Sequence, residues 1–184
     1  LAENNEGYEN LTKIVSRGFV DGFYYKPRVD FETLREFSKG IIASSACLAG
    51  EVARNLAVNR YEDAKEAALR YRDIFGADNF FLELQDHGLG VQKAVNQQLI
   101  QLSHDTGIPL IATNDIHYTQ PEDWEAHDLL LCLQTGKKAS DEDRMRYEGG
   151  QYYLKSEEEM RSLFAAVPEA LENTAKIAAR CEVE

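Results

Sequence analysis

The chain has 184 residues, 43% of them hydrophobic and 28% charged, so it can form one domain with a sizeable core and is not a disordered segment. Its 20 basic and 32 acidic residues give a net charge of −12, which argues against nucleic-acid binding over the whole surface but leaves room for a local patch. Three widely spaced cysteines predict a reducing compartment, and neither a leader nor a membrane span is indicated. We expect a cytoplasmic protein without a membrane partner.

The chain begins with a predicted helix over residues 6–21, followed by an aromatic and basic loop. Residues 23–28 of this loop read Phe-Tyr-Tyr-Lys-Pro-Arg. Two interpretations are open: the loop stacks a base or grips a phosphate, or its aromatic rings pack beside a proline turn. Asp30 is then expected to cap a short helix.

Strands and helices alternate from residue 41 onward. Short apolar runs predict strands at residues 41–43, 80–84 and 108–112, and helical periodicity predicts helices at residues 49–57, 61–75 and 91–105. This order implies right-handed crossovers and a parallel sheet or barrel. Its strands should therefore present their carboxyl ends at one edge.

Ionisable or nucleophilic side chains follow each predicted strand. Cys47 follows the first, His87 the second, and Asp115 and His117 the third. Side chains two residues apart on an extended chain point the same way, so Asp115 and His117 could bind the same metal ion or the same phosphate group. A Cys, an Asp and a His are a sensible ligand set for zinc. The alternatives are a solvated loop with a surface histidine and, for Cys47, a buried small hydrophobic residue.

The remainder of the chain is predicted to be mostly helical. Pro121 fits a helix start, and several of the apolar residues from 124 to 133 should be buried. The polar segment 136–150 is expected to be the most mobile, and residues 152–154 to form one more strand. Ser156 and Glu159 predict a capping box.

The remaining cysteines and histidines lie in segments that are predicted to be helical. A last helix should run from Pro168 to Cys181. Cys132 and Cys181 lie in helical patterns and are interpreted as core residues. His104 and His127 also lie in predicted helices and are interpreted as structural or surface residues.

Several motifs carry a resemblance to a known family. Residues 44–51, 82–88 and 112–118 resemble successive motifs of the PHP (polymerase and histidinol phosphatase) domain, and more narrowly that of the bacterial DNA polymerase III α subunit family. Further matches lie at residues 4–8, 126–137, 153–160 and 170–174. The resemblance covers nearly the whole chain in the same order.

The resemblance implies an α/β fold, an incomplete distorted β/α barrel with about seven strands when intact and a helical C-terminal extension. Residues 1–118 would be the barrel portion that carries the site. Residues 119–184 would be a mostly helical continuation toward the polymerase core. The domain's opening part, with its H-x-H motif, would be missing, so we expect unpaired strand edges at one or both sides of the sheet. The expected outcome is a dimer, a swapped element or a marginally stable monomer.

The resemblance also implies a metal site and its chemistry. Cys47, Asp115 and His117 correspond to family metal ligands, whereas His87 would be a supporting residue or a substrate contact. Zinc or manganese ions in the intact domain would promote phosphoester hydrolysis, read as 3′–5′ exonuclease proofreading. This chain alone would bind metal weakly and be inactive, and the carboxylates for DNA synthesis with Mg²⁺ would lie beyond Glu184.

The parent would be a DNA-directed DNA polymerase that works with DNA and other replicase subunits. The acidic chain alone is not expected to bind DNA tightly. Two alternatives remain for the domain: a scaffold that docks a separate proofreading exonuclease, and a free-standing PHP phosphatase.

Overall fold

The structure is a computed structural model that describes residues 1–184 apart from the side chain of Glu148. Its helices and strands, in chain order, are α1 (Asn5–Val20), α2 (Phe31–Glu36), β1 (Ala43–Ser44), α3 (Glu51–Ala57), α4 (Tyr61–Phe75), β2 (Phe80–Leu84), α5 (Gly90–Thr106), β3 (Leu110–Ala112), the 3-10 turn Pro121–Asp123, α6 (Trp124–Thr135), the 3-10 turn Glu148–Gly150, α7 (Glu157–Leu163) and α8 (Pro168–Arg180). None of the described helices is both long and apolar enough to cross a membrane.

The three strands form a parallel sheet in the order β1-β2-β3, as the alternation predicted. The bounds predicted for α4 and β2 are confirmed. β1 and β3 are shorter than their apolar runs, although Ile41, Ile42 and Ile108 are buried and the Pro109 carbonyl accepts from the Leu82 N–H of β2 at 2.9 Å. The sheet brings the carboxyl ends of all three strands to one edge.

The two faces of the sheet differ in what covers them. One face packs on α3, α4 and α5 and on the start of α8, through a cluster that includes Val52, Leu56, Leu82, Leu84, Val95, Leu99, Leu110 and Ala170. The other face carries only a small cluster of Ile42, Phe81, Ile111 and Ile177. It opens to a hollow of about 480 Å³ between the sheet and α1.

Helix α8 covers the outer edge of β3. The Asn173 side-chain amide donates to the Leu110 carbonyl at 2.9 Å, and the Thr174 hydroxyl donates to the Ala112 carbonyl at 3.0 Å. At the other side of the sheet, the Leu1 ammonium donates to the carbonyl of Ile42 at 2.7 Å. The edge at β3 is therefore covered, since a helix beside an edge satisfies its backbone groups. Dimer formation stays a prediction.

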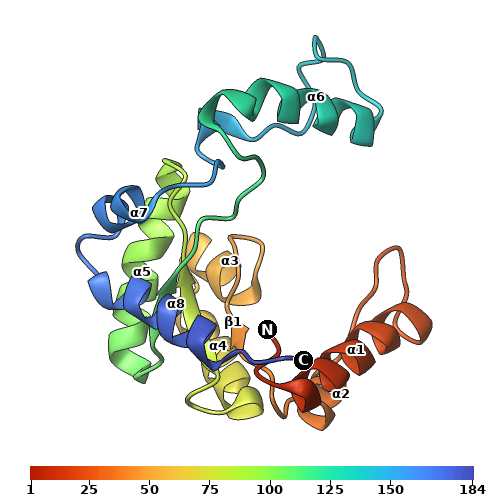
Figure 1. The fold of residues 1–184 in the computed structure, drawn as a ribbon, viewed down its shortest axis with the longest axis vertical. Coiled ribbons are helices and arrows are strands. Elements are labelled where there is room, and N and C mark those ends of the chain that lie inside the picture. The colour runs from red at the N-terminus through yellow and green to blue at the C-terminus, as the bar shows by residue number, and fades with distance from the viewer.

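Helix α6 projects from the sheet-and-helix core at one end of the long axis (Figure 1). Only Leu131 and Cys132 of this helix are buried, whereas Leu129, Leu130 and Leu133 are exposed. The expectation that several apolar residues here are buried is thus mostly wrong, because little of the described chain covers the helix. The strand expected at residues 152–154 reduces to one bridge between Tyr118 and Tyr153.

Candidate metal centre

The carboxyl end of β3 carries the Asp115–His117 pair that the D-x-H spacing singled out. Asp115 has a positive φ of 48°, a left-handed conformation that aspartate tolerates better than most residues. Asp115 Oδ1 lies 3.4 Å from His117 Nε2, and the two side chains are 39% and 28% exposed. The structure therefore brings an oxygen and a nitrogen donor together within reach of solvent.

This separation fits two ligands of one metal ion. Zinc bonds to carboxylate oxygen and imidazole nitrogen are about 2.0–2.1 Å long, and a tetrahedral angle between two such bonds places the donor atoms roughly 3.4 Å apart. With a protonated imidazole, the same contact is an ion pair. The distance between these two donor atoms is therefore compatible with a shared divalent cation.

His87 supports the backbone that leads into this pair. Its ring Nε2 lies 2.7 Å from the Asn114 carbonyl oxygen, and Nδ1 lies 2.8 Å from the Gln92 amide nitrogen. A neutral ring that donates through Nε2 and accepts at Nδ1 satisfies both contacts. Burial lowers the pKa of His87, although the bond to Asn114 opposes the shift. Both ring nitrogens are occupied, which leaves neither for a metal ion.

Two further contacts hold Asn114 and His87. The Lys155 ammonium donates to the Asn114 side-chain oxygen at 3.2 Å, and burial lowers the pKa of this lysine. The His87 ring stacks on Tyr152 with centroids 3.9 Å apart. The residue before Asp115 is therefore fixed through both its backbone and its side chain.

Cys47 follows β1 at the same edge of the sheet but outside this pair. Its side chain is exposed and lines a narrow gap together with Gln85 and Gln92. Among the described residues, no three His, Cys, Asp or Glu side chains come close enough to hold a metal ion. The structure thus brings together two of the three candidate ligands.

Glu83 is a polar residue of the sheet that sequence reasoning missed. Its carboxylate accepts from the Ser44 hydroxyl of β1 and from the hydroxyl of Thr113, the residue after β3, each at 2.5 Å. Gln85 adds a third donor at 3.2 Å. The available signal was a lone carboxylate inside the apolar strand β2. Its partners could not be read from spacing, because they come from the neighbouring strands.

His127 also lies near the site, although the sequence placed it only in a helix. Its ring centroid is 5.4 Å from that of His117, and Tyr147 lies 4.4 Å from His117 and 5.2 Å from His127. Burial, and next the neighbouring His117, lower the pKa of His127. Helix α6 therefore reaches the site through an imidazole and tyrosine cluster, and no sequence spacing indicated it.

Ionisable residues at the carboxyl edge of a parallel sheet agree with the family that the motifs suggested. The profile of the PHP domain matches residues 1–87, a range that includes Cys47 and His87. The chain therefore carries part of a PHP domain.

Comparison with individual proteins extends this match to the whole chain. DNA polymerase III subunit alpha of Borreliella burgdorferi is 47% identical over 182 residues, covering 99% of this chain and 16% of that protein. The same subunit of Treponema pallidum is 47% identical over 183 residues, covering 100% and 16%, and that of Thermus aquaticus is 40% identical over 187 residues, covering 100% and 15%. The chain thus spans about one sixth of the length of these relatives, all of which are DNA polymerase III alpha subunits.

Proposed function

We propose that this chain is part of the alpha subunit of a bacterial DNA polymerase III, the enzyme of DNA-directed DNA synthesis in chromosome replication. Identities of 40–47% over nearly the whole chain support this assignment. Because the chain matches only 15–16% of each relative, the whole polypeptide would carry nucleotide addition, its Mg²⁺ ions and its contacts with DNA and other replicase subunits. Its place would be the cytoplasm.

Within that protein, we propose that the sheet is part of a distorted β/α barrel with a metal-dependent phosphoesterase site. The observation that carries this proposal is the 3.4 Å contact between Asp115 and His117 at the end of β3. Zinc or manganese ions bound there would supply an activated water and neutralise charge on a phosphodiester. Asp115 and His117 would hold the ion, Cys47 would contribute to the intact site, and His87 would fix the loop. The reaction would be 3′–5′ exonuclease cleavage.

A scaffold that docks a separate exonuclease is the second candidate. A free-standing phosphatase is not favoured, since residues 88–184 also align with polymerase subunits.

The test uses the full-length gene product and a primed, labelled DNA with a mismatched 3′ end. Asp115→Asn with His117→Ala should abolish metal-dependent shortening of the primer and leave primer extension unchanged, because the pair would serve only hydrolysis. Glu62→Gln, which changes an exposed carboxylate on α4, is the matched control. Shortening that survives the double substitution would contradict the role of the pair, and no shortening by the unsubstituted gene product would favour the scaffold. The 184-residue chain alone should leave the primer intact.

A further inference from the structure

The loop between α1 and α2 displays its aromatic residues instead of packing them. Phe23, Tyr24 and Tyr25 are 58%, 63% and 82% exposed. The Tyr24 and Tyr25 rings contact each other edge to face with centroids 4.6 Å apart, but neither ring is buried beside the proline turn. Three adjacent exposed aromatic rings are costly in water, which points to a partner that covers them.

Residues 22–28, called the aromatic loop below, have a backbone conformation that is defined by close contacts within the loop. A Cβ atom at Gly22 would lie 1.9 Å from the carbonyl oxygen of Arg28, so only glycine permits this close approach at the base of the loop. The Tyr24 N–H donates to the Lys26 carbonyl at 3.1 Å. Tyr25, at the apex, has a φ of 60°, which a bulky residue rarely adopts. The loop holds Tyr25 outward in a defined conformation.

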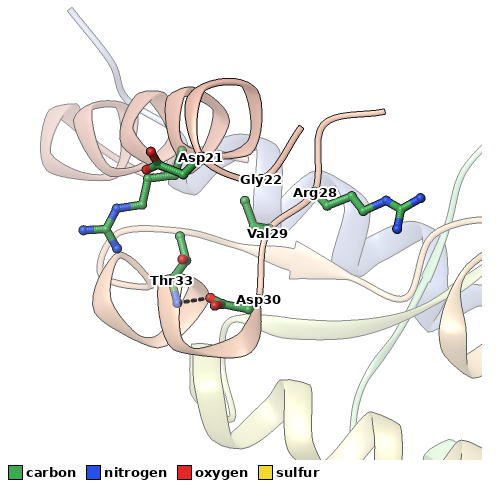
Figure 2. A pocket seen from close by; sticks show the side chains of 7 residues that line it. Asp21, Gly22, Arg28, Val29, Asp30 and Thr33 are labelled. Atoms are coloured by element: carbon green, nitrogen blue, oxygen red, sulfur yellow. Dashed lines mark hydrogen bonds between the residues drawn. The ribbon is translucent and has the colours of Figure 1, made fainter. Parts of the chain in front are cut away.

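The cations of the aromatic loop are available to an anionic partner. Neither Lys26 nor Arg28 takes part in an ion pair within the described part of the chain. The Arg28 guanidinium lies 5.2 Å from the centre of the Tyr24 ring. Figure 2 shows Arg28 extending away from Asp21 and Asp30, which line the hollow of about 530 Å³ at the base of the loop.

The charge of the aromatic loop contrasts with that of the chain. Residues 22–28 contain two basic and no acidic residues, although Asp21 and Asp30 flank the loop, whereas the chain as a whole carries −12. Exposed aromatic rings interleaved with free cations match single-stranded nucleic acid, whose unstacked bases offer faces and whose phosphates offer charge. Duplex DNA hides its base faces, and a purely apolar protein surface would leave the two cations without partners.

We propose that the aromatic loop binds single-stranded DNA, with bases stacked on Tyr25 and Phe23 and phosphates held by Lys26 and Arg28. The proposal rests on the proposed function only in taking DNA as the nucleic acid. It does not depend on the metal-binding pair. Two phosphate contacts give a salt dependence with a slope of roughly −1.4 in log–log form, and the acidic remainder of the chain keeps the affinity low.

The test is fluorescence anisotropy of a labelled oligothymidine titrated with the whole chain in the presence of EDTA. Tyr25→Ala should weaken binding by about 5- to 150-fold, the range for loss of one base stack. Tyr25→Trp should retain binding. Tyr8→Ala is the matched control, because Tyr8 is a 58% exposed tyrosine near the other end of α1. Arg28→Gln should make the salt slope shallower by roughly 0.7.

Three results would overturn the proposal. They are the absence of binding, equal binding of single strands and duplex, and binding that is unchanged in Tyr25→Ala. Self-association that Tyr25→Ala abolishes, without an effect on DNA, would instead assign the loop to a protein contact. Because EDTA removes divalent ions, failure here is distinguishable from failure of the metal-site proposal, which is measured by metal binding.

Discussion

Helices α5 and α6 both carry leucine-rich faces, yet one is buried and the other is not. Val95, Leu99 and Leu102 of α5 are at most 2% exposed, whereas Leu130 and Leu133 of α6 are 61% and 79% exposed. The difference lies in their surroundings, since α5 packs on the sheet and on α3, and α6 projects beyond them (Figure 1). Apolar content thus predicts that a segment is helical, but its burial depends on elements elsewhere in the chain.

Polar contacts hold α6 where apolar packing is sparse. The Arg144 guanidinium bonds both oxygens of Asp128 at 2.6 Å, and its side chain is only 4% exposed. Near the site, the rings of His127 and Tyr147 pack together. The α5 region is therefore stabilised by burial, and the α6 region by a charged pair and a ring cluster.

The largest expected effect contrasts one leucine from each helix. Leu99→Ala should lower the free energy of unfolding by about 2–5 kcal/mol, because it removes buried methyl groups and leaves a cavity. Leu133→Ala should change it by less than about 0.5 kcal/mol, since its side chain is already in water. Urea denaturation followed by circular dichroism measures both. Similar losses in the two variants would show that α6 has a covering partner, such as a second copy.

An intermediate effect is expected at the hydrogen bonds of His87. Gln92→Leu removes the hydrogen-bond partner of His87 ring Nδ1 and of the His87 backbone N–H. Because His87 is buried, water cannot replace these bonds. Loss of these bonds should cost about 1–3 kcal/mol of unfolding free energy. Gln97→Leu, at an exposed position of the same helix, is the control and should have little effect. A more stable Gln92→Leu variant would contradict the supporting role of His87.

The smallest effect is expected at Asp128, and it should depend on pH. The hydrogen bonds from Arg144 lower the pKa of Asp128, so the ionised pair adds stability above the ordinary aspartate pKa of about 3.9. This contribution disappears as the pH falls through the lowered pKa. Asp128→Asn should therefore speed hydrogen exchange in residues 137–147 at neutral pH and not at pH values below that pKa. An equal difference at both pH values would contradict this account.

The sequence predicted local structure well where neighbouring residues determine it. The Ser156 and Glu159 capping box and the Asp30 cap follow from spacings of three residues, and both are found. Asp115 and His117 also lie close together, but Asp115 is in a left-handed conformation and not on the extended chain that the spacing assumed. The surroundings of Glu83 and His127 were missed. Their partners come from other strands or from the α6 region, so no local pattern indicated them.

The bounds of β1 and the position of Cys47 also could not be predicted from local sequence. The run at residues 41–43 is apolar because it is buried, but only Ala43 and Ser44 join the ladder. Cys47 was placed at the correct edge of the sheet from the order of strands. Its distance from Asp115 depends on the loop after β1, which strand order does not determine.

Zinc binding tests the central claim that Asp115 and His117 form a cation site. Calorimetric titration of the chain with Zn²⁺ should show weak binding that is lost in Asp115→Asn and in His117→Ala. It should also weaken on acidification, because a ligating imidazole must be neutral. His104→Ala, at an exposed histidine of α5, is the control and should bind as the unchanged chain does. Cys47→Ser shows separately whether the thiolate takes part. Binding that persists unchanged in both Asp115→Asn and His117→Ala would contradict the account.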